Sequence, residues 1–252
     1  MFNMLFRRKP RAWRTPAGQY YNLYKEMSMQ HNLLVAGEVG SGKSSVINGI
    51  IHTLLYDSPA KVRFILIDPK RNELLMYRDL PHTLRYANKH EDIIEALKYA
   101  SALMESRYEE MEKRRLKRYD GSAVYIVIDE LADLLLTLKK QCKPILQHLL
   151  QLSRASNIHI IAGSQCVNAT VISTELRVNM TAIVGLRTAT KAHSRLLVER
   201  NGCELFPDPQ LEHKALGYYK HGCKCELYEM PYVSESELQT MCDWWQSKQC
   251  IA

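Results

Sequence analysis

The sequence predicts an α/β fold with a central, mostly parallel sheet flanked by helices, followed by a C-terminal β-hairpin and helix. Five short runs rich in Val, Ile or Leu alternate with longer amphipathic stretches, and strands that alternate with helices build parallel sheets with right-handed crossovers. The runs are apolar on both faces, as expected for strands that helices cover on both sides. A glycine-rich loop joins the first run to the first helical stretch.

The elements follow one another in a regular order. The predicted strands are 32–36, 62–67, 124–128, 158–162 and 181–186, and the predicted helices are 43–56, 91–118, 131–154 and 191–199. Apolar residues in 91–118 recur with a period close to 3.6. We expect Pro144 to split 131–154 into two helices, because proline interrupts helical hydrogen bonding. Residues 215–230 read as a hairpin that turns at His221-Gly222, and a helix follows at 234–247.

The chain divides into a basic arm at residues 1–30 and one domain at 31–252. The first fourteen residues carry five cations and no acid, and Pro10 and Pro16 interrupt any regular pattern. The composition, 46% hydrophobic and 24% charged over 252 residues, argues against a disordered or fibrous protein. No apolar run approaches the roughly 20 residues of a membrane-spanning helix. The net charge of +7 permits a polyanionic partner without establishing one.

The cysteines favour a reduced, intracellular protein. There are seven, and no signal peptide precedes them. Cys223 and Cys225 are too close together for a usual zinc-binding pair. His213 and His221 could complete a metal site, but we favour a β-hairpin that happens to carry thiols.

The strongest motif is Gly-Glu-Val-Gly-Ser-Gly-Lys-Ser at 37–44, which fits the phosphate-loop pattern G-x-x-x-x-G-K-[ST] without mismatch. Backbone N–H groups of such a loop surround the β-phosphate, and the following helix adds its positive end. Lys43 should reach the β- and γ-phosphates, and Ser44 should bind Mg²⁺. Placement between a strand and a helix disfavours the alternative, a glycine turn that binds nothing. The expected nucleotide-binding residues are Gly37, Glu38, Val39, Gly40, Ser41, Gly42, Lys43, Ser44 and Ser45.

Two adjacent carboxylates end the strand at 124–128. Asp129 can hold Mg²⁺ through water, and Glu130 can polarise the water that attacks the γ-phosphorus. The carboxyl end of a parallel strand is also where open sheets bind ligands. The pair therefore indicates an NTPase with its own base, although an Asp-Glu helix cap is the alternative.

Two further polar residues follow in order. Gln165 comes after strand 158–162, where it could touch the γ-phosphate and report its loss to the next loop. Arg154 precedes that strand. It could neutralise a helix C-terminus, or it could act as an arginine finger toward a neighbouring subunit. Spacing leaves both readings open.

These residues resemble the FtsK/SpoIIIE family of DNA-pumping ATPases over roughly 31–250. The similarity covers HNLLVAGEVGSGKSSVINGIIHTLLY (31–56), the Asp68-Pro69-Lys70 segment, MESRYEEM (104–111), VIDELADLLL (127–136) and RASNIHIIAGSQ (154–165). The resemblance implies a RecA-like P-loop fold of the ASCE type and a ring, typically a hexamer, around double-stranded DNA. It also implies translocation driven by hydrolysis of ATP with Mg²⁺. It favours Arg154 as a finger acting in trans, with Arg195 as a second candidate.

The chain also departs from the family pattern. The membrane-spanning N-terminal region and the C-terminal winged-helix module have no counterpart here, and Cys166-Val167 replaces an Arg-Pro. We therefore expect a compact translocase of a plasmid, phage or conjugative element, in the cytoplasm, with a membrane channel or relaxase as a potential recruiting partner. The alternatives are an ATPase that powers or gates a secretion or conjugation channel with protein or nucleoprotein cargo, and an ATP-gated adaptor without turnover.

DNA contacts are expected in loops that follow the nucleotide-sensing strands, where a hydrolysis signal can move a ligand. The candidates are Lys139, Lys140, Lys143 and Arg177. The basic run 113–118 is favoured instead as a solvated helix end, because i,i+4 acidic partners and the helix C-terminus both accommodate cations. No base-reading motif is visible, so binding to the phosphate backbone is expected.

Overall fold

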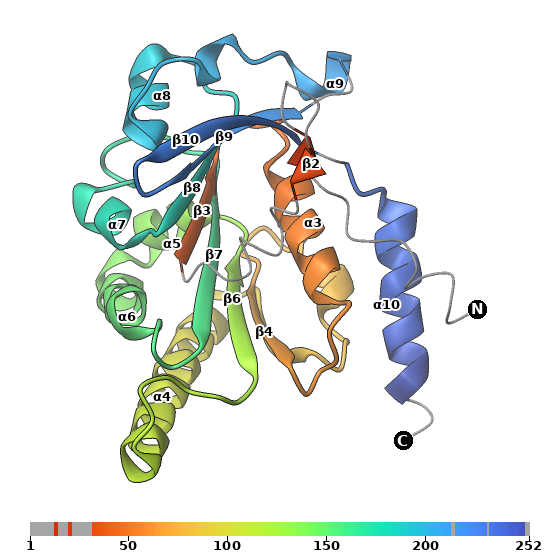
Figure 1. The fold of residues 1–252 in the computed structure, drawn as a ribbon, viewed down its shortest axis with the longest axis vertical. Helices are drawn as coiled ribbons and strands as arrows, with labels where there is room; N and C mark the ends of the chain where they lie inside the picture. Colours follow the sequence, from red (N-terminus) through yellow and green to blue (C-terminus); the bar gives the residue numbers. More distant parts are fainter. Residues whose placement is uncertain (1–12, 15–19, 22–31, 213–214, 231, 250–252) are drawn as a thin grey trace.

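A ten-stranded sheet forms the centre of the molecule in the computed structural model, which describes residues 13–14, 20–21, 32–212, 215–230 and 232–249 (Figure 1). The order is β2-β1-β10-β9-β8-β3-β7-β6-β4-β5, and the six strands from β8 to β5 are parallel. The strands are β1 (Trp13–Arg14), β2 (Tyr20–Tyr21), β3 (Asn32–Ala36), β4 (Val62–Ile67), β5 (Thr83–Ala87), β6 (Ala123–Ile128), β7 (Ile158–Ser164), β8 (Ala182–Gly185), β9 (Ala215–His221) and β10 (Lys224–Met230).

Helices cover both faces of the parallel strands, as the apolar runs predict. Along β3, Leu34 and Ala36 pack toward one face while Leu33 and Val35 pack toward the other, because side chains alternate along a strand. The first face is covered by α4 (His90–Arg114), α5 (Leu131–Thr137), α6 (Lys139–Leu152), α7 (Thr174–Asn179) and α8 (Lys191–Val198). The second face is covered by α3 (Lys43–Leu54), the short 3₁₀ helix η1 (Leu75–Tyr77) and α10 (Glu235–Gln249).

The predicted break at Pro144 is wrong. The chain separates α5 from α6 at Leu138 (φ −113°, ψ 22°), and Pro144 lies inside α6. A proline removes one N–H from the helix. Pro144 and Lys140, whose carbonyl would have accepted that N–H, are both exposed, so water can serve the carbonyl instead. The cost of the proline is therefore small enough for the helix to continue.

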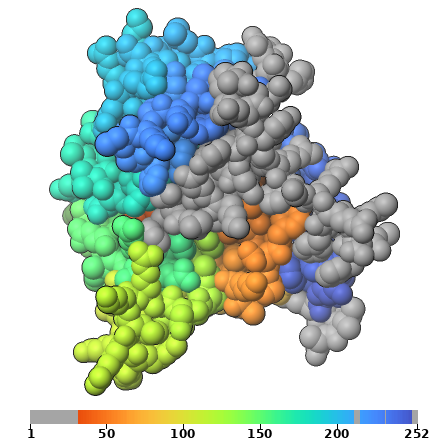
Figure 2. Space-filling view, viewed as in Figure 1, coloured from red at the N-terminus to blue at the C-terminus, as the bar shows by residue number. Residues whose placement is uncertain are grey.

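Helix α4 is shorter than the predicted 91–118. It ends at Arg114, and Arg115 takes a left-handed conformation (φ 53°) while the N–H of Leu116 donates to the carbonyl of Met111, a common helix-ending arrangement. Arg114 pairs with Glu110 and Asp120 at 2.7 and 2.6 Å. This end of α4 projects from the body of the molecule (Figure 2).

The C-terminal hairpin and helix are confirmed. Strands β9 and β10 pair from Ala215↔Met230 to His221↔Lys224, and Gly222 takes a left-handed φ of +58° in the turn. The hairpin continues the sheet through β9, which runs antiparallel to β8. Within the described residues no group of three His, Cys, Asp or Glu side chains could hold a metal ion, and His213 lies outside them.

Part of the predicted N-terminal arm extends the sheet. Strand β1 pairs with β10 through Arg14↔Glu229, and β2 pairs with β1. The basic residues Arg7, Arg8, Lys9 and Arg11 lie outside the described residues. No described helix is long and apolar enough to cross a membrane.

Helix α10 docks on the second face through Trp245. The indole Nε1 donates to the carbonyl of Leu55 at 2.9 Å, and the ring meets the imidazole of His82 edge-on, with 4.5 Å between centroids. His82 is buried, its Nε2 lies 2.9 Å from the Asp57 carbonyl, and its Nδ1 has no partner among the described residues. Protonation of Nδ1 would bury a charged N–H without an acceptor, so the folded protein favours the neutral imidazole.

We expect His82 to make folding stability pH-dependent. Burial lowers the pKa of His82 below its usual value of about 6.5. The unfolded chain then binds more protons, so this stability is present above pH 6.5 and decreases as the pH falls below it. Urea unfolding at pH 7.5 and pH 5.5 measures the effect. His82→Gln should reduce the difference between the two pH values, and an unchanged difference would assign it to other groups.

Candidate active site

The phosphate loop leaves the carboxyl end of β3 and wraps into the start of α3. Its N–H groups at Gly37 and Glu38 donate to the carbonyls of Ser164 and Arg187, at 3.2 and 2.9 Å. Gly40 and Gly42 have φ values of +76° and +94°, a region that side chains with a Cβ rarely enter. The glycine spacing of the motif is therefore required by the backbone path that brings Lys43 to the start of the helix.

The side chain of Lys43 reaches Asp129, which follows the carboxyl end of β6. Its Nζ lies 2.5 Å from Asp129 Oδ1 and 2.8 Å from the Asp129 carbonyl oxygen, and both side chains are about 97–98% buried. A buried ion pair of this kind is stable only when both charges are well hydrogen-bonded. Lys43 is thus held at the base of the loop, beside the strand that carries the acidic pair.

The predicted magnesium ligands fit a hard divalent cation. Asp129 Oδ2 is buried and accepts no hydrogen bond within the described residues, and an unpartnered buried carboxylate oxygen is costly. Ser44 lies half-buried at the first turn of α3. Oxygen ligands of these two types are those that Mg²⁺ prefers in nucleotide sites. Asp129 and Ser44 would hold the ion.

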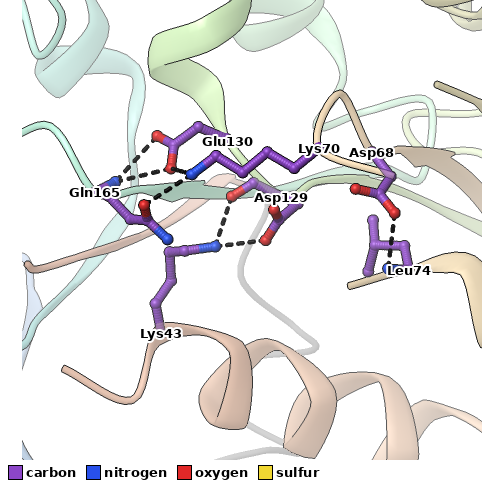
Figure 3. A network of polar contacts seen from close by, with 7 residues as sticks. All are labelled: Lys43, Asp68, Lys70, Leu74, Asp129, Glu130 and Gln165. Carbon is purple, nitrogen blue, oxygen red and sulfur yellow. Dashed lines mark hydrogen bonds and ion pairs between the residues drawn. The ribbon is translucent and has the colours of Figure 1, made fainter. Parts of the chain in front are cut away.

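Glu130 and Gln165 are hydrogen-bonded to each other, since they follow the neighbouring strands β6 and β7. The backbone N–H of Gln165 donates to Glu130 Oε1 and Oε2 at 3.0 and 3.2 Å. Lys70 completes the group: its Nζ lies 3.2 Å from Glu130 Oε2 and 2.7 Å from Gln165 Oε1 (Figure 3). Glu130 is 2% exposed. The predicted base and the predicted sensor therefore form one hydrogen-bonded unit.

A cleft of about 770 Å³ opens over the phosphate loop. Lys43, Glu73 and Gln165 line it, together with Glu38, Val39, Gly40, Gly42, Ser44 and Ser45 of the predicted loop. Another part of the wall comes from the C-terminal part of the chain and was not predicted from sequence: Pro209, Gln210, Ala215, Glu229, Met230 and Tyr232. The cleft is large enough for a nucleotide, since ligand sites commonly measure about 300–1,000 Å³.

Arg154 does not serve this chain's own cleft. It is exposed in the turn between α6 and β7, and this turn precedes a parallel strand whose carboxyl end carries Gln165. Arg154 therefore lies at the amino-terminal ends of the parallel strands, whereas the phosphate loop lies at their carboxyl ends. Buried Arg107 fixes the turn, because its guanidinium donates to the carbonyls of Ser156 and Asn157 at 2.8 and 3.1 Å.

The predicted DNA-contacting residues lie apart from the cleft and in different settings. Lys139 and Lys140 are exposed at the start of α6. Lys143 pairs with Glu175 of α7 at 3.3 Å. Arg177 is half-buried, and its guanidinium donates to the carbonyl of Leu196 at 3.1 Å. Of these four, Lys139 and Lys140 are exposed, whereas Lys143 and Arg177 already have partners within the part of the chain that the structure describes.

The fold and the site define a P-loop ATPase. The model of the FtsK/SpoIIIE family matches residues 19–126. A DNA translocase FtsK from Leptospira interrogans is 34% identical over 229 residues, covering 82% of this chain and 24% of the relative. One from Lactococcus lactis is 30% identical over 200 residues, covering 71% and 26%. The chain is thus an FtsK/SpoIIIE-like ATPase, and it spans about a quarter of the length of these curated relatives.

Solved structures share the fold. The pCW3 conjugation coupling protein TcpA aligns with a TM-score of 0.76 at 20% identity, over 94% of this chain and 71% of that one. EssC from Geobacillus thermodenitrificans aligns with a TM-score of 0.79 at 16% identity, over 96% and 49%. The EccC cytoplasmic domain from Thermomonospora curvata aligns with a TM-score of 0.75 at 19% identity, over 93% and 30%. The predicted RecA-like, mostly parallel P-loop architecture is confirmed.

Proposed function

We propose that this protein is an ATP-driven translocase of double-stranded DNA that works as a homo-oligomeric ring, with six subunits by analogy to the family. The observation that carries the proposal is the Glu130–Gln165 hydrogen bond. It links a base for ATP hydrolysis to a side chain at the end of β7. The segment 166–178 follows directly, so a change at the γ-phosphate has a short path to a surface loop. The similarity to proteins named DNA translocase FtsK supports DNA as the cargo.

Each residue has a distinct part in the hydrolysis step. The phosphate loop binds the β-phosphate with its N–H groups, and Lys43 neutralises charge on the β- and γ-phosphates. Bound Mg²⁺, held by Ser44 and Asp129, would offset phosphate charge. Glu130 accepts a proton from the attacking water, and Gln165 responds to loss of the γ-phosphate. Arg154 would reach the nucleotide of the adjacent subunit.

The DNA would lie along the segments that follow β6 and β7. The candidate cations there belong to helices α6 and α7 rather than to loops, and Lys139 and Lys140 are exposed at the start of α6. Lys143 and Arg177 would become DNA ligands only after releasing Glu175 and the Leu196 carbonyl. The contacts would be to phosphates, since no base-reading motif is visible in the sequence.

ATP turnover should rise severalfold when duplex DNA is added. The stimulation should decrease with salt, by a slope of about −0.9 in log affinity per neutralised phosphate. Steady-state phosphate release with and without duplex DNA measures both effects. Lys43→Ala, which removes the cation at the phosphates, should show no turnover in either condition and controls for a contaminating ATPase. Turnover that does not respond to DNA at low salt would contradict the DNA cargo.

Arg154 should act between subunits. Arg154→Ala and Lys43→Ala chains should each be nearly inactive alone, because one lacks the finger and the other lacks a competent nucleotide site. Mixing them places an intact Arg154 beside an intact Lys43 at some interfaces, so part of the turnover should return. A matched mixture of Lys43→Ala and Glu130→Gln chains should recover no turnover. Each of these changes inactivates the nucleotide site of the chain that carries it, so no site in the mixture is intact. Equal recovery in the two mixtures would contradict a role in trans.

A second candidate is an ATPase that powers or gates a secretion or conjugation channel. The observation that favours it is the fold shared with EssC, EccC and the conjugation coupling protein TcpA. This candidate would act at the cytoplasmic side of a membrane and be recruited by a channel or relaxase partner. It differs from the first by its cargo: turnover should respond to a peptide or nucleoprotein substrate and be indifferent to naked DNA. A plasmid, phage or conjugative element is the proposed source in either case.

A further inference from the structure

Lys70 connects the two groups that hydrolysis depends on. It comes from the loop after β4 and reaches Glu130 and Gln165, which come from the ends of β6 and β7 (Figure 3). We propose that Lys70 is a positioning residue that holds the Glu130 carboxylate and the Gln165 amide in their working geometry. The proposal rests on hydrolysis through Glu130, which is part of the proposed function, and is independent of the DNA cargo.

The loop that carries Lys70 is held by hydrogen bonds to the buried Asp68. Asp68 is fully buried, and its Oδ2 accepts hydrogen bonds from the Leu74 N–H at 3.1 Å and the Tyr86 hydroxyl at 3.3 Å. The Arg71 N–H closes a turn on the Asp68 carbonyl at 3.1 Å. Lys70 is thus a long side chain on a rigid turn. Its ammonium reaches the site with little freedom of the backbone beneath it.

Glu130 needs a cation at this position. Its side chain is only 3% exposed, and a buried carboxylate without a charged partner is strongly disfavoured. Among the described residues its carboxylate accepts hydrogen bonds from the Gln165 N–H and from Lys70. Without Lys70, the backbone N–H of Gln165 alone would stabilise the negative charge of the Glu130 carboxylate. The carboxylate would then be free to rotate out of the geometry that a base requires.

Gln165 depends on the same ammonium. Its Oε1 accepts from Lys70 at 2.7 Å, which fixes the rotation of the amide at the edge of the cleft. An ammonium has three donors and can serve both groups at once. Lys43 cannot substitute, because its Nζ is engaged with Asp129. The two lysines therefore have separate partners: Lys43 is paired with Asp129, and Lys70 is paired with the base and the sensor.

The test is the effect of Lys70→Ala on ATP turnover in the absence of DNA. We expect kcat to fall about 10- to 100-fold, the range seen when an orienting partner is removed from an active site, while KM for ATP changes less than about twofold. Lys70→Arg should recover much of kcat, because a guanidinium can also donate to both acceptors. Lys70→Ala in a Glu130→Gln background should cause little further loss, because Lys70 acts through Glu130.

Several outcomes would overturn the proposal. An unchanged kcat would remove any role in positioning, and an increased kcat would make Lys70 a restraint on Glu130. A raised KM at constant kcat would make it a phosphate ligand. Lys61→Ala, an exposed lysine before β4, is the matched control and should behave as the parent chain. If Glu130→Gln alone leaves turnover intact, the hydrolysis mechanism fails; if only Lys70→Ala is silent, this inference alone fails.

Discussion

Glu130→Gln should lower ATP turnover about 10³-fold while nucleotide binding persists. General-base catalysis contributes about 10²- to 10⁴-fold, and an amide cannot take the proton that the carboxylate accepts from water. The shape is nearly unchanged, and the amide oxygen can still accept from the Gln165 N–H and Lys70, which now bind Glu130. The loss should therefore appear in kcat and leave the affinity for ATP within a few-fold of the parent value.

Steady-state phosphate release and titration of a fluorescent ATP analogue separate the two quantities. Glu109→Gln is the matched control, since Glu109 is an exposed residue of α4 that lies outside the cleft. Its turnover should equal that of the parent chain. Turnover of Glu130→Gln within threefold of the parent would assign the base to another group and leave Glu130 a structural partner of Lys70.

The strands that could be predicted are those whose signal is local. Runs such as 62–67 and 124–128 are apolar on both faces because helices bury both faces, so the burial itself appears in the sequence. Strand β5 lacks such an apolar run and was not predicted. It lies at the edge of the sheet, its only fully buried residue is Ala87, and Arg85 is exposed. An edge strand needs no apolar run, and nothing in TLRYA distinguishes it from a loop.

The core of the site could be predicted because its motifs all follow the carboxyl ends of parallel strands. Strands β3, β7 and β6 are neighbours, so residues at their carboxyl ends must meet, and Lys43, Asp129, Glu130 and Gln165 do so. The role of Lys70 could not be predicted, because it depends on β4 lying beside β6. The sequence offered only a lysine two residues past an acid at another strand end, within the Asp68-Pro69-Lys70 segment that resembles the family. The wall at 209–232 depends likewise on β9 joining β8.

Gly163→Ala should both destabilise the protein and inactivate it. A Cβ at Gly163 would overlap the carbonyl oxygen of Asp129 and lie 3.0 Å from Lys43 Cδ and Ile47 Cδ1. The obstacle is backbone directly after the neighbouring strand β6, which cannot move aside as a flexible side chain can. We expect a loss of about 3 kcal/mol in unfolding free energy, the upper part of the range for overpacking. Turnover should fall roughly 100-fold, because displacement by about 1 Å is enough for that loss.

The reason for the double effect is that the same carbonyl binds Lys43 at 2.8 Å. A methyl group that displaces Asp129 also displaces Lys43, the proposed phosphate ligand, and the adjoining Glu130, the proposed base. Urea unfolding and phosphate release measure the two effects, and Gly222→Ala is the control. Gly222 has a positive φ but open space around its Cβ position, so it should lose about 1 kcal/mol of stability and no turnover. If Gly163→Ala retained turnover at the same loss of stability, the contact between β7 and Asp129 would support the fold without positioning the site.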